Sequence, residues 1–374
     1  MDSPDVVVIG GGIAGASVAY ELAADRSVLL LEAESELARH STARSAATYV
    51  PGHGGSAMRA LITASGPRFA QLEAELDTPP LLAPRDVIWI AVDDRGEVEL
   101  ARLLADRAGE PQQPVAIDAA EALRRCRALA PGHVRAAAVA TGSADIDVDA
   151  LHQGYVRGLR RRGGAVRTGA RVAALARRGA GWRVDAGGDV IDTALVVDAA
   201  GAWADEVADL AGVRRIGLVP MRRTIAVARV PDPTRLRGPS RSPMVIEADY
   251  AFYFKADGAD LLVCPGDETP MPPCDARPDE LDVALALERV EAVTELGLRS
   301  IRTSWAGLRS FVPDRRPVVG ERPDHPGFAF VAGQGGAGIE TAPALSAFAA
   351  AVITGSPLPA DVALAAAALS PGRL

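Results

Sequence analysis

Hydrophobic and polar positions at the start of the chain follow two different periods. Residues 6–9 form a short β-branched run, which is typical of a parallel strand buried on both faces. Ala14, Val18 and Leu22 then recur at every fourth residue, which predicts a helix with one apolar face against a sheet. Residues 28–31 form a second apolar run. The pattern therefore predicts a strand, a helix and another strand.

The turn between the first strand and the helix carries the motif Gly-x-Gly-x-x-Gly, at Gly10, Gly12 and Gly15. In such a unit the first glycine allows a tight turn, the second lets the backbone approach a pyrophosphate, and the third lets the helix pack on the strand. The helix N-terminus offers N–H groups and a partial positive charge to the phosphates. Glu32 ends the second strand, where a carboxylate can accept both ribose hydroxyls. The unit predicts a dinucleotide site without distinguishing NAD from FAD.

Two later segments extend this α/β pattern. Residues 195–197 form an apolar strand that runs into the small residues 199–201, which suit the close approach of a bound cofactor. Residues 333–338 form a glycine-rich loop between another apolar strand and an alanine-rich helix. The N-terminus of that helix would face a negative or polarisable group.

The composition narrows the class of protein. The 374 residues are 48% hydrophobic and carry a net charge of −8, which disfavours nucleic acid or an anionic membrane as the main partner. Charges, Gly or Ala interrupt every apolar segment within about 18 residues, so we expect no membrane span and no signal peptide. Lys255 is the only lysine, which disfavours pyridoxal chemistry. Cys126, Cys264 and Cys274 show no metal-binding or disulfide spacing, so we expect no metal and a cytoplasmic location.

Long collinear motifs occur along nearly the whole chain: GGGIAG, HSTARSAA, ADIDVDALHQGYVRGLRRRGG, VVDAAGAWA, FYFK, WAGLRSFVPD and GQGGAGIETAP. Together they resemble the FAD-dependent D-amino-acid oxidase/glycine oxidase family, and within it most resemble bacterial D-arginine dehydrogenase. The resemblance implies an α/β fold with an α+β substrate part. A discontinuous Rossmann-like FAD-binding domain would span residues 1–80, 142–215 and 315–374, and an antiparallel-sheet substrate domain residues 81–141 and 216–314.

The resemblance implies FAD as the cofactor. Some relatives attach FAD through a cysteine, but none lies near residues 307–314, so we expect non-covalent binding. The stretch 41–47 would wrap the pyrophosphate and flavin, Val172 would meet the adenine, and the helix start at 335–341 would face the pyrimidine edge of the ring. The expected cofactor residues are Gly10, Gly12, Ile13, Ala14, Gly15, Glu32, Ala33, Ser41, Thr42, Arg44, Ser45, Ala46, Ala47, Thr48, Val172, Ala200, Gly201, Trp203, Gly307, Arg309, Gly335, Gly336, Ala337, Gly338, Ile339, Glu340 and Thr341.

The same resemblance implies a substrate site for an α-amino acid. Arg222 and Arg309 would clamp the carboxylate, with the Tyr253 hydroxyl as a third donor, because the guanidinium fork matches a carboxylate bidentately. His53 could accept the amine proton, because a histidine side chain can gain and lose a proton near neutral pH, although an exposed loop histidine is an equal alternative. The further expected pocket residues are Thr48, Met244, Ile246, Gly336 and Ile339.

Val87 is where this chain departs from the D-arginine enzyme. That enzyme has an acidic residue at the matching position, which grips the cationic side chain. Asp86 is adjacent, but strand alternation would turn it to the other face. Thr48 and His53 correspond to the lid residues of that enzyme, and residues 48–56 would form a lid hinged by glycines. We therefore expect a D-amino acid with an apolar or small neutral side chain.

Several alternatives stay open from the sequence. An N-methyl amino acid (sarcosine-type) or glycine oxidase and a 2-hydroxy-acid dehydrogenase would use the same fold and the same carboxylate clamp. A non-catalytic, flavin-bearing subunit is a further possibility. Oxidase relatives often use a lysine beside the flavin, and only Lys255 is available, so a dehydrogenase is favoured. The sequence leaves the electron acceptor open between oxygen, a quinone and a dye-like acceptor. It also leaves the oligomeric state open between monomer and homodimer.

Overall fold

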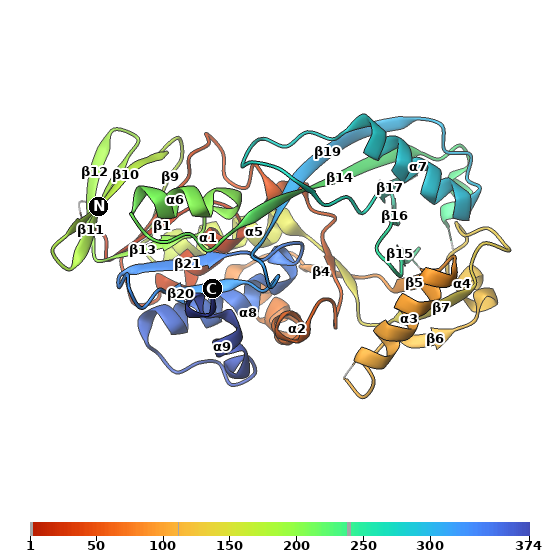
Figure 1. Ribbon diagram of the computed structural model, residues 1–374, viewed down its shortest axis with the longest axis horizontal. Helices are drawn as coiled ribbons and strands as arrows, with labels where there is room; N and C mark the ends of the chain where they lie inside the picture. Colours follow the sequence, from red (N-terminus) through yellow and green to blue (C-terminus); the bar gives the residue numbers. More distant parts are fainter. Residues whose placement is uncertain (1–2, 111, 238–240) are drawn as a thin grey trace.

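The predicted strand–helix–strand unit lies at the centre of a mostly parallel sheet. In the computed structural model, which describes residues 3–110, 112–237 and 241–374, it comprises β1 (Val6–Ile9), α1 (Ile13–Leu22) and β2 (Val28–Leu31) (Figure 1). The strand order is β20-β21-β13-β1-β2-β9, with β20 antiparallel to β21. The other strands are β9 (Ala165–Arg167), β13 (Leu195–Asp198), β20 (Val318–Glu321) and β21 (Phe328–Ala332).

Both faces of this sheet are covered, which explains why its strands are apolar without alternation. Val8 and Leu30 pack on one face against Val18 and Phe348, while Val7 and Leu29 pack on the other. The first face is covered by α1, α2 (Ser56–Leu76), α5 (Val148–Arg161) and α8 (Gly338–Thr354). The second is covered by α6 (Ala204–Leu210) and a small antiparallel sheet of β10 (Val172–Arg178), β11 (Gly181–Ala186) and β12 (Asp189–Thr193). The short α9 (Ala366–Leu369) follows α8.

A second, mainly antiparallel sheet forms the other half of the molecule (Figure 1). Its order is β18-β14-β17-β16-β15-β5-β7-β6, with β19 beside β14 and a parallel pairing of β15 with β5. One face packs against α4 (Ala119–Arg125) and α7 (Glu280–Thr294), and the other against Ala46, Val50 and α3 (Asp94–Asp106). The strands are β5 (Val87–Ala91), β6 (Val115–Ile117), β7 (Ala136–Ala140), β14 (Val219–Arg229), β15 (Met244–Glu247), β16 (Tyr253–Asp257), β17 (Asp260–Cys264), β18 (Thr269–Pro270) and β19 (Ile301–Phe311).

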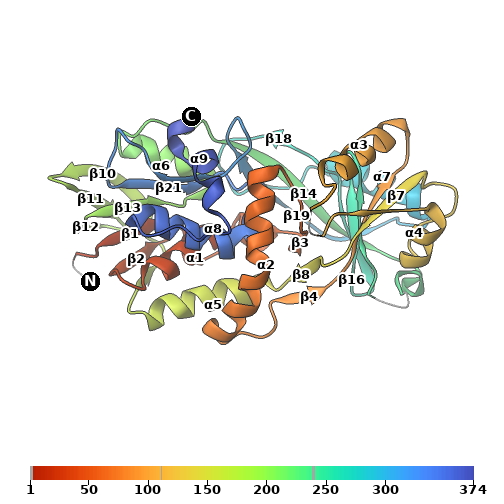
Figure 2. The ribbon, with the colours of Figure 1, turned by 90° about the horizontal axis from the view of Figure 1, so that it is seen from below.

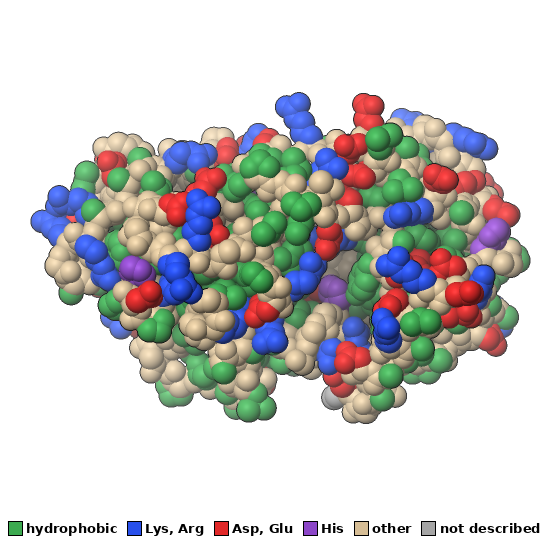
Figure 3. All heavy atoms as spheres, in the orientation of Figure 1, with side chains coloured by type: hydrophobic (Ala, Val, Ile, Leu, Met, Phe, Trp, Pro, Cys, Tyr) green, Lys and Arg blue, Asp and Glu red, His purple; other side chains and the backbone are tan. Residues whose placement is uncertain are grey.

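A small sheet of β3 (Thr48–Tyr49), β8 (Ala144–Ile146) and β4 (Leu82–Pro84) lies between the two larger sheets (Figure 2). The surface is hollowed where the two halves meet, and basic side chains and a histidine are visible there (Figure 3). The strands of the first sheet come from residues 6–31, 165–198 and 318–332, and those of the second from 87–140 and 219–311. The domain bounds expected from the sequence stay a prediction.

Asp145 of β8 connects the small sheet to the second large sheet through buried charges. Its carboxylate accepts from Lys255 Nζ at 2.7 Å and Arg85 Nε at 2.7 Å, and pairs with Arg241 Nη2 at 2.6 Å. Burial alone would raise the pKa of Asp145, but Lys255 and Arg85 hold it below its ordinary value. The Lys255 ammonium also donates to the Ala46 carbonyl at 2.5 Å. This cluster joins the loop after residue 45 to both sheets.

Asp145→Asn should destabilise the protein by about 3–5 kcal/mol, because it leaves Lys255 and Arg85 as uncompensated buried cations. A depressed carboxyl pKa contributes stability at pH values above its unfolded value near 3.9, and that stability is lost as the pH falls through the folded value. The variant should therefore lose part of the acid sensitivity of the wild type. Urea denaturation between pH 3 and pH 7 would measure both effects. Asp192→Asn, which breaks exposed pairs with Arg178 and Arg183, should cost at most about 1 kcal/mol.

Candidate active site

The glycine motif forms a turn that only glycine fits at two places. Gly10 has φ +109°, and a Cβ there would lie 2.5 Å from the Ala199 carbonyl oxygen. A Cβ at Gly15 would lie well inside van der Waals contact of the Gly10 carbonyl oxygen, so α1 packs against the end of β1. The Thr42 hydroxyl accepts from the Ile13 N–H at 3.0 Å and holds the following loop on the helix N-terminus. No side chain therefore covers the backbone of this turn where a diphosphate would approach.

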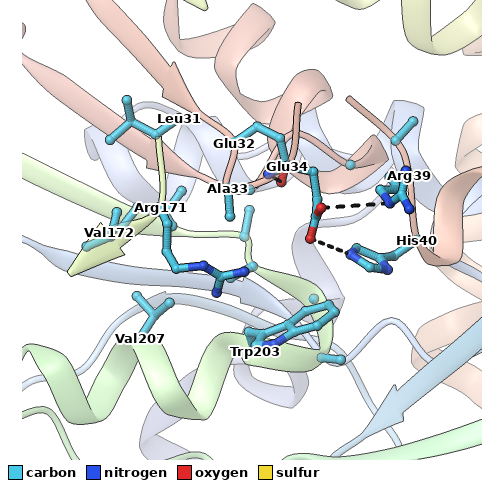
Figure 4. Close-up of a pocket in the computed structure, with 18 of the residues that line it drawn as sticks. Leu31, Glu32, Ala33, Glu34, Arg39, His40, Arg171, Val172, Trp203 and Val207 are labelled. Carbon is cyan, nitrogen blue, oxygen red and sulfur yellow. Dashed lines mark hydrogen bonds and ion pairs between the residues drawn. The ribbon is translucent and has the colours of Figure 1, made fainter. Parts of the chain in front are cut away.

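Glu32 lies beside the first of two cavities that open above the strand ends (Figure 4). Its carboxylate accepts from the N–H groups of Gly11 at 2.8 Å and Glu34 at 2.9 Å, which fixes it at the cavity edge. Apolar walls come from Leu31, Val172, Val207 and the Trp203 ring. An apolar slot with a fixed carboxylate at its rim suits an adenine and its ribose.

A cluster of charged and aromatic side chains closes the other side of this cavity. Glu34 accepts from His40 Nε2 at 3.2 Å and pairs with Arg39 Nε at 3.7 Å. The His40 ring lies 4.7 Å from the Trp203 ring. The Arg171 side chain points across the cavity towards Trp203 (Figure 4). Arg39, His40 and Arg171 were not expected from the sequence.

A second cavity continues the first, and both are lined by Gly12, Ser41, Thr42, Ala199 and Gly201. Together they form one groove across the carboxyl ends of β1 and β13, the usual ligand position of a parallel sheet. The expected cofactor residues that line this groove are Gly10, Gly12, Ile13, Ala14, Glu32, Ala33, Ser41, Thr42, Arg44, Ser45, Val172, Ala200, Gly201, Trp203, Gly307, Arg309, Gly335, Gly336, Gly338 and Ile339.

The far end of the groove meets the first turn of α8, where the backbone again leaves no room for side chains. Gly335 has φ +57°, and a Cβ there would overlap the Phe311 ring. A Cβ at Gly336 would lie 2.8 Å from Arg309 Nη1. The groove therefore has main-chain walls at both ends, and it fits an extended dinucleotide with a planar ring beside α8.

Other expected cofactor residues lie elsewhere. Thr341 is fully buried and donates to the Ala337 carbonyl at 2.8 Å, and Ala337 lines the neighbouring cavity instead. Ala46 is buried with its carbonyl on Lys255, and Ala47 has φ +53°. Neither Ala46 nor Ala47 lines the groove, because the chain turns there into the small central sheet.

Arg44 lines the groove, but its charge is already compensated. The guanidinium donates to the carbonyls of Ala276 at 3.0 Å and Ala306 at 2.9 Å and pairs with Asp275. Ser41 Oγ donates to the Leu308 carbonyl at 2.5 Å. These bonds attach residues 41–45 to β19. Arg44 therefore positions the loop at the edge of the groove.

Arg309 and Arg223 extend from the groove into a neighbouring cavity, and both side chains line both spaces. Arg309 Nη2 donates to the Tyr253 hydroxyl at 3.3 Å, and no ion pair of Arg309 occurs within the part of the chain that the structure describes. Arg223 Nη2 pairs with Glu268 Oε1 at 3.0 Å. Burial raises the pKa of Tyr253 above its ordinary value, so the phenol stays neutral. The arrangement presents two cations beside the planar end of the groove.

The structure does not bring Arg222 into the carboxylate clamp that the sequence analysis expected. It pairs with Asp282 at 2.6 Å and lies within 4 Å of Asp267 and Asp279, and it does not line the cavity. Successive strand residues face opposite sides of a sheet. The register pairs Met221 with Arg309 and Arg223 with Gly307, so Arg223 shares the face of Arg309. The sequence shows two adjacent arginines, and only this register decides between them.

The expected apolar pocket residues lie on one face of the second sheet. The register pairs Val87 with Met244 and Ile246 with Tyr253, and all four side chains are at most 5% exposed. They form the packed layer of that face, and they are not among the side chains that line the cavity beside Arg309. Asp86 faces the other way, as alternation predicts, and pairs with Arg125 of α4 at 3.4 Å.

The expected lid is tied to α8 by one carboxylate. Glu340 is 4% exposed, and it accepts from the Val50 N–H at 3.0 Å and lies 3.0 Å from His53 Nδ1. His53 lines the cavity beside Arg309. Thr48 does not, because β3 pairs with β8 and its hydroxyl lies 3.4 Å from Lys255 Nζ. Glu340 thus acts on the loop and not on the groove, and the mobility of residues 48–56 stays a prediction.

Tyr250 is the main cavity residue that the sequence did not indicate. It lies in the turn between β15 and β16 with φ +62°, and its ring is 6.0 Å from the His53 ring and 5.3 Å from the Trp89 ring. A non-glycine residue in the left-handed region is a signal of local constraint, but it is visible only in the folded chain. Gln334 and Arg223 also line both spaces without having been expected.

Comparisons with known proteins agree with this geometry. The sequence pattern of the DAO family, described as FAD dependent oxidoreductase, matches residues 5–352. The hydrogen cyanide synthase subunit HcnC of Pseudomonas aeruginosa is 26% identical over 217 residues, which are 57% of this chain and 50% of that protein. The chain thus spans half the length of this curated relative.

Solved structures show the same fold along the chain. L-proline dehydrogenase from P. horikoshii has a TM-score of 0.86 at 20% identity and covers 100% of this chain and 98% of its own. Glycine oxidase from Geobacillus kaustophilus has a TM-score of 0.84 at 21% identity, with coverage of 97% and 98%. These comparisons do not single out D-arginine dehydrogenase, but they confirm the expected glycine oxidase-type fold. The chain belongs to the DAO family of FAD-dependent oxidoreductases, and FAD is its cofactor.

Proposed function

We propose that this protein catalyses the oxidative deamination of an amino acid, with the D configuration and a side chain that is not cationic. The observation that carries the proposal is the position of Arg309 and Arg223, which line both the flavin end of the groove and the neighbouring cavity. A substrate carboxylate held there would place its Cα next to the ring. The residues of the groove would hold FAD, which would supply the two-electron oxidant for the hydride from Cα, and water would hydrolyse the imine product to a 2-oxo acid and ammonia.

Arg309 is the better placed of the two carboxylate ligands. Its guanidinium has a hydrogen bond to Tyr253 and no acidic partner among the described residues, whereas Arg223 already pairs with Glu268. A guanidinium fork can bind both carboxylate oxygens, which fixes the orientation of the substrate as well as its affinity. Tyr253, which packs behind the cavity, then acts as a positioning residue for Arg309.

The amine must lose its proton before the hydride leaves, and His53 lines the cavity, whereas the carboxylates there, Asp249, Glu268 and Asp314, are paired with arginines. Its Nδ1 faces Glu340, which fixes the ring and leaves Nε2 for the substrate side. We propose that His53 accepts the amine proton through Nε2, directly or through one water molecule. The buried Glu340 carboxylate would stabilise the resulting imidazolium.

The packed layer beside the cavity bears on the substrate side chain. Val87, Met244 and Ile246 belong to this layer and not to the cavity lining, and the layer offers no carboxylate to a guanidinium or ammonium group. We therefore propose that apolar or small neutral side chains are accepted and arginine and lysine are not. We also propose dehydrogenase chemistry, because the only lysine is held by Asp145 and the Ala46 carbonyl.

An anaerobic screen of the yellow holoenzyme tests this function. D-, L- and N-methyl amino acids and 2-hydroxy acids would be mixed with the protein, and flavin reduction would be followed by the loss of visible absorbance. We expect reduction by D-amino acids with uncharged side chains. Reduction by dithionite but by no amino acid would reject the proposal. A strong preference for D-arginine would overturn the argument from Val87.

A further inference from the structure

Arg107 is a buried cation without a partner among the described residues. It follows the last turn of α3 and is 6% exposed, and no described residue provides a hydrogen-bond acceptor for its buried Nε and Nη1 atoms. No ion pair of Arg107 occurs among residues 3–110, 112–237 and 241–374. A Cβ placed on Gly52 of the expected lid would lie 3.3 Å from Arg107 Nη1. The guanidinium therefore lies directly beneath that loop.

The neighbouring acids do not compensate this charge. Asp106 and Glu110 both pair with Arg59, at 2.7 and 3.1 Å. Other buried arginines have partners: Arg85 pairs with Asp145, and Arg223 with Glu268. Burial is the main effect that lowers the pKa of Arg107. Leaving a guanidinium unpaired in such a position costs free energy, which an anionic ligand would recover.

The space around Arg107 adjoins the cavity that contains Arg309. Arg107 lines a cavity together with Gly54, Asp249 and Tyr250, and these three also line the cavity that contains Arg309. Asp249 is paired with Arg95 at 3.0 Å, so it does not neutralise the site. Gly54, Asp249 and Tyr250 thus border both the space beside Arg309 and the space beside Arg107.

We infer that Arg107 binds a second carboxylate, at the far end of the substrate, so that the preferred substrate class is amino acids with an acidic side chain. This inference rests on the proposed function and extends it from neutral to acidic side chains. Arg309 and Arg223 would hold the α-carboxylate, and Arg107 the distal one. A neutral side chain would fit but leave Arg107 unpaired, and a cationic one would be repelled.

Matched pairs of substrates test this assignment. The kcat/KM of holoenzyme for flavin reduction would be compared between D-glutamate and D-glutamine, and between D-aspartate and D-asparagine, which differ in charge but hardly in shape. We expect the wild type to prefer one acid over its amide by at least about thirtyfold, and Arg107→Gln to remove most of that preference through KM. Arg124→Gln is the matched control, because Arg124 of α4 is exposed, pairs with Glu121 and is not among the residues that line either cavity.

The outcomes separate this inference from the function on which it rests. A wild type that oxidises neutral amino acids but shows no preference for either acid would overturn the role of Arg107 and leave the proposed function intact. The same conclusion would follow if Arg107→Gln lowered the kcat/KM of acid and amide equally. If Arg107→Gln does not fold, the wild-type ratios and the binding of glutarate, measured by calorimetry against a glutaramate control, decide the question. Failure of every amino acid to reduce the flavin would reject both.

Discussion

Arg309→Met will lower kcat/KM for amino acid oxidation by about a thousandfold, because it removes the proposed carboxylate ligand, which has no acidic partner among the described residues. Truncating one side of a desolvated charge pair costs roughly 2–5 kcal/mol, and each 1.4 kcal/mol is a factor of ten. The loss should appear in KM and in the rate of flavin reduction, because the same contact binds the substrate and orients Cα. Anaerobic stopped-flow reduction would measure both terms.

Arg223→Met should lose less, about tenfold to a hundredfold, because Arg223 shares its charge with Glu268. Arg222→Met distinguishes the sequence-based clamp from the observed one. It should keep kcat/KM within about tenfold and reduce stability instead, since Asp282 and Asp267 lose a partner. Equal losses of kcat/KM in Arg222→Met and Arg309→Met would show that the strand register described above is not the one used in catalysis.

Gly15→Ala should weaken FAD binding by more than about a hundredfold. The added methyl group would overlap the Gly10 carbonyl oxygen, so α1 would have to move away from the end of β1. Overpacking of this kind costs about 1–3 kcal/mol or more, and here the displaced backbone also carries the N–H groups that face the phosphates. Fluorescence titration of the apoprotein with FAD would give the change in Kd.

Gly55→Ala is the control for this substitution. Gly55 has φ −74°, and a Cβ there would meet nothing within 4 Å. It should therefore bind FAD as the wild type does. If Gly15→Ala retained wild-type affinity, the close packing of α1 on β1 would not be what shapes the phosphate end of the groove.

The sequence indicated the cofactor half of the site more completely than the substrate half. Gly10, Gly15 and Glu32 act within one local unit, where spacing along the chain fixes the distance in space. Alternation along a strand also placed Val87 and Asp86 on opposite faces, as observed. These are short-range regularities, and a single sequence contains them.

The site residues that the sequence analysis did not identify depend on contacts between distant segments of the chain. The choice between Arg222 and Arg223 depends on pairing with β19, which lies more than 70 residues further along the chain. Arg107 belongs to no recognisable sequence motif. Its place beside the cavity is visible only in the folded chain, where Gly52 and Tyr250 lie near it. Such positions cannot be recognised from periodicity or local motifs.

The cluster around Asp145 also gives the molecule a built-in reporter. Lys255 is the only lysine side chain, and its ammonium is held between the small central sheet and the loop after residue 45. An amine-reactive reagent can modify it only when those segments separate. The rate of acylation at this one position therefore measures how often the segments around Lys255 separate, and mass spectrometry can follow it in a single peptide.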